Sequence, residues 1–393
     1  MKKIRIVFIV HQINQGGMES ALFNLISLMD KDKFDITIFS VIGWGEWEDK
    51  FRDSGFYLID QYARLREPTG FFSKLSNIIK IKMIDIIKKI NCKQLLSVSS
   101  TKKFDIVVSY QVYSPYGGIG FPRKAKTIKY VHGNVASNAH YRLMQQQLKY
   151  ENEKYDRIIC VSDDAKKAFI NLTGRTDNIL TLFNPINGDN ILKRSEEDFD
   201  LRISAKTDYI CAVGRLSPEK GFERLVNVFN RLISDGIKSK LVIVGDGVER
   251  NKLTNLAELL GLTEYIELIG HKDNPYPYIR NSLFTVLPSF TEGLPVVAME
   301  SLCLGIPIVS TYPSAGELFG EEICGIITEN DDDSLYQGMK AMLTDTEFYK
   351  KLKKGAENRS CFFKGATMVR EVEKVFIELY NESEKHTGSQ INI

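Results

Sequence analysis

Short, continuous runs of apolar residues recur along the whole chain and predict buried β-strands. Examples are IRIVFIV at 4–10 and RIICVS at 157–162 in the first half, and YICAVG at 209–214 and FTVLPS at 284–289 in the second. Because the apolar residues do not alternate with polar ones, these runs are typical of strands that are buried on both faces. The same pattern occurs at 35–41, 105–110, 127–132, 240–247, 265–270, 306–310 and 325–328.

Helical patterns separate the predicted strands, for instance at 18–30, 223–236 and 250–261. This alternation of strands and helices predicts parallel sheets that are flanked by helices. The alternation breaks once, in TLFNPINGDNILKRSEEDFDLR at 181–202, where Asn-Pro, Asn-Gly and a polar run predict a loop. We therefore place a domain boundary near residue 185.

The fold expected from this pattern is α/β, with two Rossmann-like, doubly wound parallel-sheet domains. A length of 393 residues also favours two domains over one. We assign 1–185 to the first domain, 186–362 to the second, and 363–393 to a final helix with a polar tail that we expect to be frayed.

The composition is that of a globular protein without disulfides or a zinc site. Hydrophobic residues make up 43 % of the chain and charged residues 26 %, and none of the six cysteines lies in a CxxC or CxxH pair. The apolar run near the start is shorter than that of a signal peptide, and no stretch approaches the roughly 18 apolar residues that span a bilayer. We therefore expect a cytoplasmic protein.

The charge is unevenly distributed, although the net charge is only +2. Between Arg64 and Lys129 the chain has fourteen Lys or Arg and three acidic residues. Two interpretations of the segment 74–103 stay open: a helix docked peripherally on the anionic inner face of the membrane, or an ordinary helix packed on its own sheet with solvated lysines. No nucleic-acid-binding motif accompanies the charge, so we expect no nucleic acid partner.

Two glutamates follow the predicted strand at 284–289, in the stretch SFTEGLPVVAMESLCLG. Ligands of open α/β sheets bind beyond the carboxyl ends of the strands, so this is where a site is expected. Gly293 allows the backbone to approach a ligand closely, and Pro295 suits the first turn of a helix. The backbone N–H groups of Gly293 and Leu294 would then form an anion site at the helix N-terminus.

The spacing of Glu292 and Glu300 suits a nucleotide-sugar. A carboxylate at Glu300, well inside the helix, can accept two hydrogen bonds from a vicinal diol such as a ribose. Glu292, in the loop, can do the same for the hydroxyls of a second sugar. The alternative is a helix N-terminal glutamate together with a solvated one, and the spacing alone does not decide between the two.

A second motif, AVGRLSPEKGFERLV at 212–226, also follows a predicted strand and begins a helix. Arg215 and Lys220 can neutralise a diphosphate there, the arginine as a bidentate fork and the lysine as a point charge. They would stabilise the charge that develops on a leaving group. The alternative is that both are surface charges, which Glu219 and Glu223 could pair with.

Two weaker signals precede these motifs. Gly16 and Gly17 follow the first strand and could let backbone amides reach a phosphate, but they do not form G-x-G-x-x-G, so a dinucleotide dehydrogenase is weakly supported. His132 lies just past another strand, where a neutral imidazole could bond a sugar hydroxyl or serve the structure only. His11 is a weaker candidate of the same kind.

In this order, each after a strand, the motifs GG, VGRLSPEKG and Glu292-x7-Glu300 with EGLP resemble family 4 of the retaining glycosyltransferases, the group 1 glycosyltransferases. That resemblance implies the GT-B fold, in which two Rossmann-like domains face each other across a cleft. It also implies that the first domain binds the acceptor, that the second binds the nucleotide-sugar, and that the helix in 363–393 crosses back to the first.

The resemblance assigns roles to individual residues. Catalytic roles are implied for Glu292, His132, Arg215 and Lys220. Arg215 and Lys220 would bind the donor diphosphate, Glu300 the ribose and Glu292 the sugar hydroxyls. The remaining donor-binding residues implied are Gly16, Gly17, Gly270, His271, Gly293, Leu294 and Pro295, with Lys272 beside the base.

The function predicted is a retaining hexosyltransferase of bacterial surface polysaccharide or glycoconjugate synthesis. It would move a hexose or N-acetylhexosamine from a nucleoside diphosphate sugar, UDP favoured, to a hydroxyl of a lipid-linked glycan. We expect no cofactor and no metal, because Arg215 and Lys220 supply the positive charge. The alternatives are a catalytically silent GT-B partner subunit and a nucleotide-sugar epimerase on the same fold.

Overall fold

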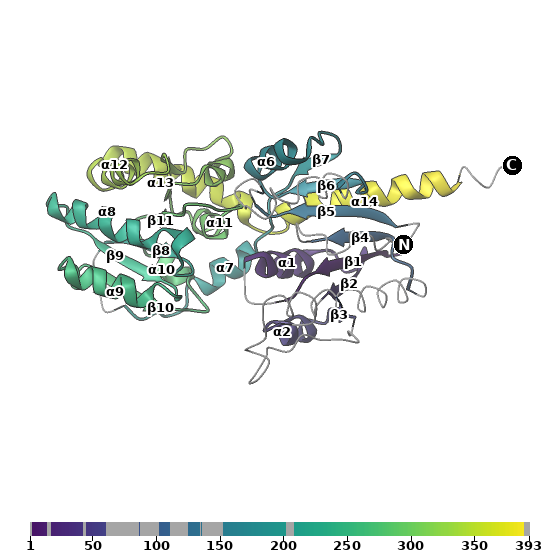
Figure 1. Cartoon of the computed structure of the whole chain (residues 1–393), viewed down its shortest axis with the longest axis horizontal. Helices are drawn as coiled ribbons and strands as arrows, with labels where there is room; N and C mark the ends of the chain where they lie inside the picture. The colour runs from purple at the N-terminus through teal and green to yellow at the C-terminus, as the bar shows by residue number, and fades with distance from the viewer. Residues whose placement is uncertain are drawn as a thin grey trace. The chain divides into compact units, whose positions relative to one another are not determined.

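The computed structural model describes most of the chain and divides it into two compact units. The residues described are 2–13, 17–41, 45–59, 86, 102–110, 125–133, 135, 152–201 and 208–388, with the backbone alone for 384–388. The N-terminal unit comprises Met1–Pro185 with Val369–Ile393, and the C-terminal unit comprises Ile186–Met368 (Figure 1). Gly16 and nearly all of the basic segment 74–103 lie outside the described residues.

The N-terminal unit is built on a seven-stranded parallel sheet in the order β3-β2-β1-β4-β5-β6-β7. Its strands are β1 (Ile4–Val10), β2 (Phe34–Ser40), β3 (Tyr57–Leu58), β4 (Ile106–Ser109), β5 (Lys126–Val131), β6 (Arg157–Cys160) and β7 (Ile179–Thr181). Among the described residues its helices are α1 (Gly17–Leu28), α2 (Glu48–Asp53), α6 (Asp163–Thr173) and α14 (Thr367–Gly388).

Helix α14, which ends the described chain, packs on the N-terminal unit (Figure 1, yellow). The buried ring of Phe376 lies 6.2 Å from that of Phe8 in β1 and 6.4 Å from that of Phe34 in β2. Glu382 forms an ion pair with Arg157 of β6 at 2.5 Å. Two β-strands that are adjacent in the sheet therefore rest on a residue more than 330 positions further along the chain.

The C-terminal unit is built on a six-stranded parallel sheet in the order β10-β9-β8-β11-β12-β13. Its strands are β8 (Tyr209–Val213), β9 (Lys240–Val244), β10 (Ile266–Gly270), β11 (Thr285–Leu287), β12 (Ile308–Ser310) and β13 (Gly325–Ile327). Its helices are α7 (Gly188–Arg194), α8 (Phe222–Ser234), α9 (Arg250–Leu259), α10 (Tyr276–Arg280), α11 (Val296–Cys303), α12 (Asp332–Thr344) and α13 (Thr346–Arg359).

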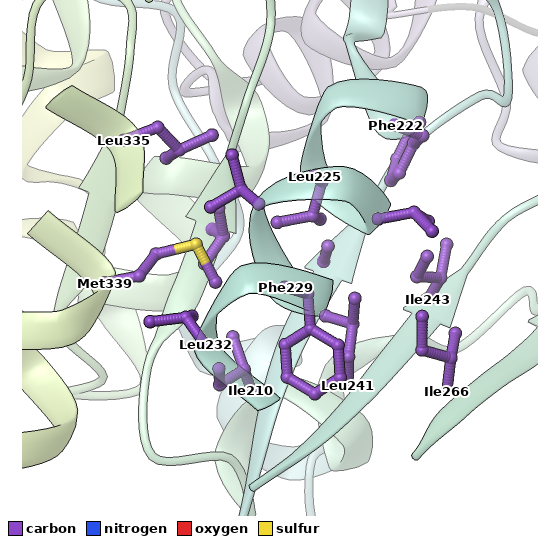
Figure 2. Close-up of a cluster of buried hydrophobic side chains, with 14 of the residues drawn as sticks. Ile210, Phe222, Leu225, Phe229, Leu232, Leu241, Ile243, Ile266, Leu335 and Met339 are labelled. Carbon is purple, nitrogen blue, oxygen red and sulfur yellow. The ribbon is translucent and has the colours of Figure 1, made fainter. Parts of the chain in front are cut away.

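Successive residues of the central strands point to opposite faces of this sheet and pack in two separate hydrophobic clusters. Ile210 of β8 packs under α8, α9 and α12, in the cluster shown in Figure 2. Its neighbours Tyr209 and Cys211 pack on the opposite face, with Tyr278 of α10. Because both faces are covered by helices, the strands read as continuous apolar runs, which is why the sequence predicts them. The doubly wound α/β prediction is confirmed.

Other details differ from the sequence-based expectation. The expected loop at 181–202 contains helix α7, which Asn187 caps by accepting a hydrogen bond from the Asn190 N–H at 3.1 Å. The short strands β3 and β7 were not predicted, because two or three residues are too few to show a pattern. No helix in the described part of the chain is long and apolar enough to cross a membrane.

The packing of α14 leads to a first prediction. Phe376→Ala should lower the free energy of unfolding of the N-terminal unit by about 3–5 kcal/mol, because it removes a fully buried ring between β1 and β2. Urea unfolding followed by far-UV circular dichroism measures this free energy. Lys374→Ala, at an exposed position of the same helix, is the control and should change stability little. Equal destabilisation by both variants would contradict the packing described.

Candidate functional site

The strand order of the C-terminal sheet reverses at β8, which lies between β9 and β11. Helices that follow β8 and β11 therefore lie on opposite faces of the sheet, and the loops that lead to them diverge from one point at its carboxyl edge. Ligands of open α/β sheets bind at such points. The two loops are Gly214–Gly221, called the lysine loop here, and Pro288–Pro295, called the glutamate loop.

These two loops are held in direct contact. The Phe290 N–H donates to the Glu219 carbonyl at 2.9 Å. Gly221 has φ +69°, and a Cβ there would lie only 2.1 Å from the Pro288 carbonyl oxygen. Glycine is therefore required at this position for two reasons, the left-handed backbone and the close approach of the other loop.

An ion pair also joins the loops. Lys220 Nζ lies 2.6 Å from Glu292 Oε1, and the Ser289 hydroxyl donates to the same oxygen at 2.7 Å. The two side chains are only 27 % and 14 % exposed, so water screens the pair less than it would at the surface. The alternative, in which Glu219 and Glu223 pair with Arg215 and Lys220 as surface charges, holds only for Arg215 and Glu219: Lys220 pairs with Glu292, and Glu223 pairs with Lys252.

Arg215 lies on the lysine loop but extends into solvent. Its side chain is 74 % exposed, and its guanidinium is 3.5 Å from Glu219. The Ser217 hydroxyl donates to the same Glu219 oxygen at 2.6 Å and lowers the pKa of that carboxyl. The Arg215 side chain is therefore weakly held, and it can turn toward an anion while giving up only the long contact with Glu219.

Glu300 lies in the second turn of α11 and has a weak partner. The Tyr276 hydroxyl is 3.4 Å from Glu300 Oε1, which is long for a hydrogen bond. Burial raises the pKa of Glu300 to about 7, and the Tyr276 contact opposes that shift only in part. A desolvated carboxyl with one long hydrogen bond is suited to accept hydrogen bonds from a ligand.

The start of α11 differs slightly from the expectation. Pro295 is the N-cap residue, with an extended ψ of 109°, and the helix begins at Val296. The Leu294 side chain is buried and belongs to the core. The helix ends at Cys303, with Gly305 at φ +68° just after it.

The loop after β10 contains the other predicted donor residues. Gly270 has φ +87° at a bulge of the strand, and the exposed His271 ring is 3.2 Å from Asp273. Lys272 lines a cavity of about 1050 Å³ that extends along β10 and α9. Neither Lys220 nor the two glutamates of α11 and its loop line that cavity.

His132 follows β5 in the N-terminal unit and lies next to two tyrosine rings. The three rings form a cluster: the His132 ring centroid is 4.4 Å from that of Tyr110 and 5.6 Å from that of Tyr130, with an interplanar angle of 16° to Tyr130, and the two tyrosine centroids are 4.8 Å apart. Burial lowers the pKa of His132 to about 4, so the imidazole is neutral at pH 7 and can donate at one nitrogen and accept at the other. Gly17 begins α1 in the same unit.

Several residues of these sites were not predicted from the sequence. Ser289 contacts Glu292 and Tyr276 contacts Glu300. The rings of Tyr110 and Tyr130 lie next to that of His132. The sequence contains a signal for the tyrosines, since Tyr130 lies in the strand that leads to the histidine and Tyr110 follows the neighbouring strand β4. No group of three or more His, Cys, Asp or Glu side chains placed to hold a metal ion occurs among the described residues.

Known proteins resemble this chain in sequence and in fold. The family model described as glycosyl transferases group 1 matches residues 193–359, most of the C-terminal unit. The crystal structure of Anabaena HepE in complex with UDP superposes with a TM-score of 0.76 at 14 % identity, over 95 % of this chain and 100 % of that one. The match to the group 1 glycosyltransferases thus covers the C-terminal unit, and the chain as a whole has the GT-B fold.

Two curated proteins that are similar to this chain cover different shares of it. An uncharacterized glycosyltransferase of Haemophilus influenzae is 25 % identical over 89 % of this chain and 92 % of its own length. The N-acetylgalactosamine-N,N'-diacetylbacillosaminyl-diphospho-undecaprenol 4-alpha-N-acetylgalactosaminyltransferase of Campylobacter jejuni is 35 % identical over 50 % of this chain. That second match spans about half, 53 %, of the Campylobacter enzyme.

The raised pKa of Glu300 predicts how the stability of this protein depends on pH. The carboxyl ionises near pH 4.5 when the chain is unfolded and near pH 7 when it is folded, so stability falls as the pH rises through this window. Glu300→Gln should therefore stabilise the free protein at pH 8, by up to about 3 kcal/mol, and hardly at all at pH 4.5. Thermal melting at both pH values measures the difference, and a gain of equal size at both would contradict the assignment.

Proposed function

We propose that this glycosyltransferase moves a hexose or N-acetylhexosamine from a nucleoside diphosphate sugar, preferably a UDP-sugar, to a hydroxyl of a lipid-linked glycan, with retention of the anomeric configuration. The observation that carries the proposal is the Lys220–Glu292 pair at the switch point of the C-terminal sheet. In this proposal the lysine neutralises the diphosphate of the donor and the carboxylate beside it binds sugar hydroxyls. Arg215 on the same loop adds a second cation.

The names of related proteins support the choice of substrates. The Campylobacter relative acts on a diphospho-undecaprenol-linked sugar, and one relative from Escherichia coli belongs to O-antigen biosynthesis. The Anabaena protein of the same fold has been crystallised with UDP-glucose. A UDP-sugar donor and a glycan acceptor on a lipid diphosphate, in surface polysaccharide synthesis, fit these names together.

The chemistry proposed begins with an exchange of partners. In the free protein Lys220 neutralises Glu292. When a donor diphosphate binds, Lys220 and Arg215 pair with it, and the Glu292 carboxylate becomes available to the hydroxyls of the donor sugar. Glu300 accepts hydrogen bonds from the ribose, and the neutral His132 bonds a sugar hydroxyl.

Bond cleavage and formation then occur on the same face of the sugar. The bond between the anomeric carbon and the diphosphate breaks, and the two cations stabilise the charge on the leaving oxygens. The acceptor hydroxyl forms the new bond from the same side, and its proton passes to the departing diphosphate. No metal enters this scheme, because the positive charge comes from side chains.

Donor-dependent nucleotide release tests the proposal. Purified protein should release UDP from a UDP-hexose or UDP-N-acetylhexosamine when a polyprenyl-diphosphate sugar is present, and NMR of the product should show the donor's anomeric configuration. Lys220→Ala should lower kcat by about 100-fold or more, because it removes charge at the leaving group. Lys252→Ala is the matched control, since Lys252 forms an equally short ion pair away from both loops.

Two other results would overturn the proposal. Release of no nucleotide from UDP-, GDP- or ADP-sugars by the wild-type chain would favour a catalytically silent partner subunit. An epimerised donor sugar formed without acceptor, detected by chromatography of the sugar nucleotides and NMR, would favour an epimerase. A product of inverted configuration would remove the retaining mechanism and leave the transferase.

A further inference from the structure

Arg224 is a buried cation whose role none of the motifs explains. It lies in the first turn of α8, and its side chain is only 7 % exposed. Buried arginines are rare unless their donors are used. Here Nε donates to Asp332 at 3.1 Å, one terminal nitrogen to the Asn330 side chain at 2.5 Å, and the other to the Asn330 carbonyl at 3.2 Å.

Asn330 connects Arg224 to the glutamate loop by hydrogen bonds. Its side-chain NH₂ donates to the Phe290 carbonyl at 3.0 Å, while its side-chain oxygen accepts from Arg224. The Phe290 ring, 50 % exposed, covers the guanidinium at 4.1 Å. Since the Phe290 N–H bonds Glu219, this residue is fixed at three points: its N–H, its carbonyl and its ring.

Phe290 lies two residues before Glu292, so whatever fixes Phe290 also fixes the carboxylate opposite Lys220. We infer that Arg224, through Asn330 and Phe290, is a positioning residue that holds Glu292 in register with Lys220 for the donor. It acts through another residue and does not itself contact the donor. The inference rests on the proposed function. The positioning by Arg224 would preorganise the site for the donor.

The acidic run at 329–333 gains an explanation from the same contacts. Asp331 caps α12 by accepting from the Ser334 N–H at 2.8 Å, and Asp332 and Asp333 each pair with an arginine of α8. Asn330, within this run, is the residue that reaches the glutamate loop. The run therefore fastens α8 and α12 together and, at one position, fastens the loop to both.

Arg231 provides a matched control two turns further along α8. It pairs with Asp333 at 2.8 Å and lies over the Tyr336 ring at 4.4 Å, as Arg224 pairs with Asp332 and lies over Phe290, but its side chain is 45 % exposed. Among the described residues, Arg231 forms no ion pair, hydrogen bond or ring contact with the glutamate loop. A merely structural role for Arg224 would make the two arginines equivalent in activity assays once stability is matched.

The test compares Arg224→Gln with Arg231→Gln. We expect Arg224→Gln to lower kcat for UDP release about tenfold at temperatures where both variants are folded, and Arg231→Gln to leave it near wild type. Asn330→Asp should reproduce the loss, because it keeps the acceptor for Arg224 but replaces the donor to Phe290 with an oxygen. Equal activity of the two arginine variants would overturn the inference.

A double-mutant cycle with Glu292 separates positioning from general destabilisation. In the Glu292→Gln background, Arg224→Gln should have little further effect on kcat, because the residue through which it acts is already changed. A full tenfold loss in that background would also overturn the inference.

Hydrogen exchange separates this inference from the proposed function. The amide of Phe290 should exchange about tenfold faster in Arg224→Gln than in wild type or Arg231→Gln, since a restraint on that loop is lost. This measurement needs no substrate, so it stands if the wild-type chain releases no nucleotide. Unchanged exchange in Arg224→Gln would end the positioning role even in an active enzyme.

Discussion

The close approach of the lysine loop and the glutamate loop depends on a glycine. Gly221 adopts a left-handed backbone with φ +69°, and the Pro288 carbonyl oxygen occupies the space in which any side chain would begin. Because the loops meet there, the backbone bond from Phe290 to Glu219 and the 2.6 Å pair of Lys220 with Glu292 can both form. A cation and a carboxylate from the loops that follow two adjacent strands thus form one site.

The parts of the site differ in how firmly the free protein holds them. Glu292 has two close partners, whereas Glu300 has one long hydrogen bond, and Arg215 extends into solvent. The desolvated carboxyl of Glu300 destabilises the free protein above pH 7, as residues arranged for a ligand often do. The firm elements define where a ligand would bind, and the loose ones are those with hydrogen-bonding capacity left for it.

The sequence allows much of the fold to be predicted but only part of the site. The central strands were predictable because both their faces are covered, and the Lys220–Glu292 pair lies in loops that directly follow such strands. Neither the capped helix α7 nor the Arg224–Asn330 contact could be predicted in the same way. Arg224 and Asn330 are 106 positions apart, and only the packing of α8 beside α12 brings them together.

The path of the chain has a consequence for biosynthesis. Phe376 completes the packing around β1 and β2, yet the whole of Ile186–Met368 is translated between them and α14. Domains generally fold as units during synthesis, starting from the N-terminus. Here the first unit to emerge from the ribosome lacks its last helix, so the second can be complete while the first still exposes apolar β-strands. Chaperone binding during translation should therefore concentrate on the half of the protein that is made first.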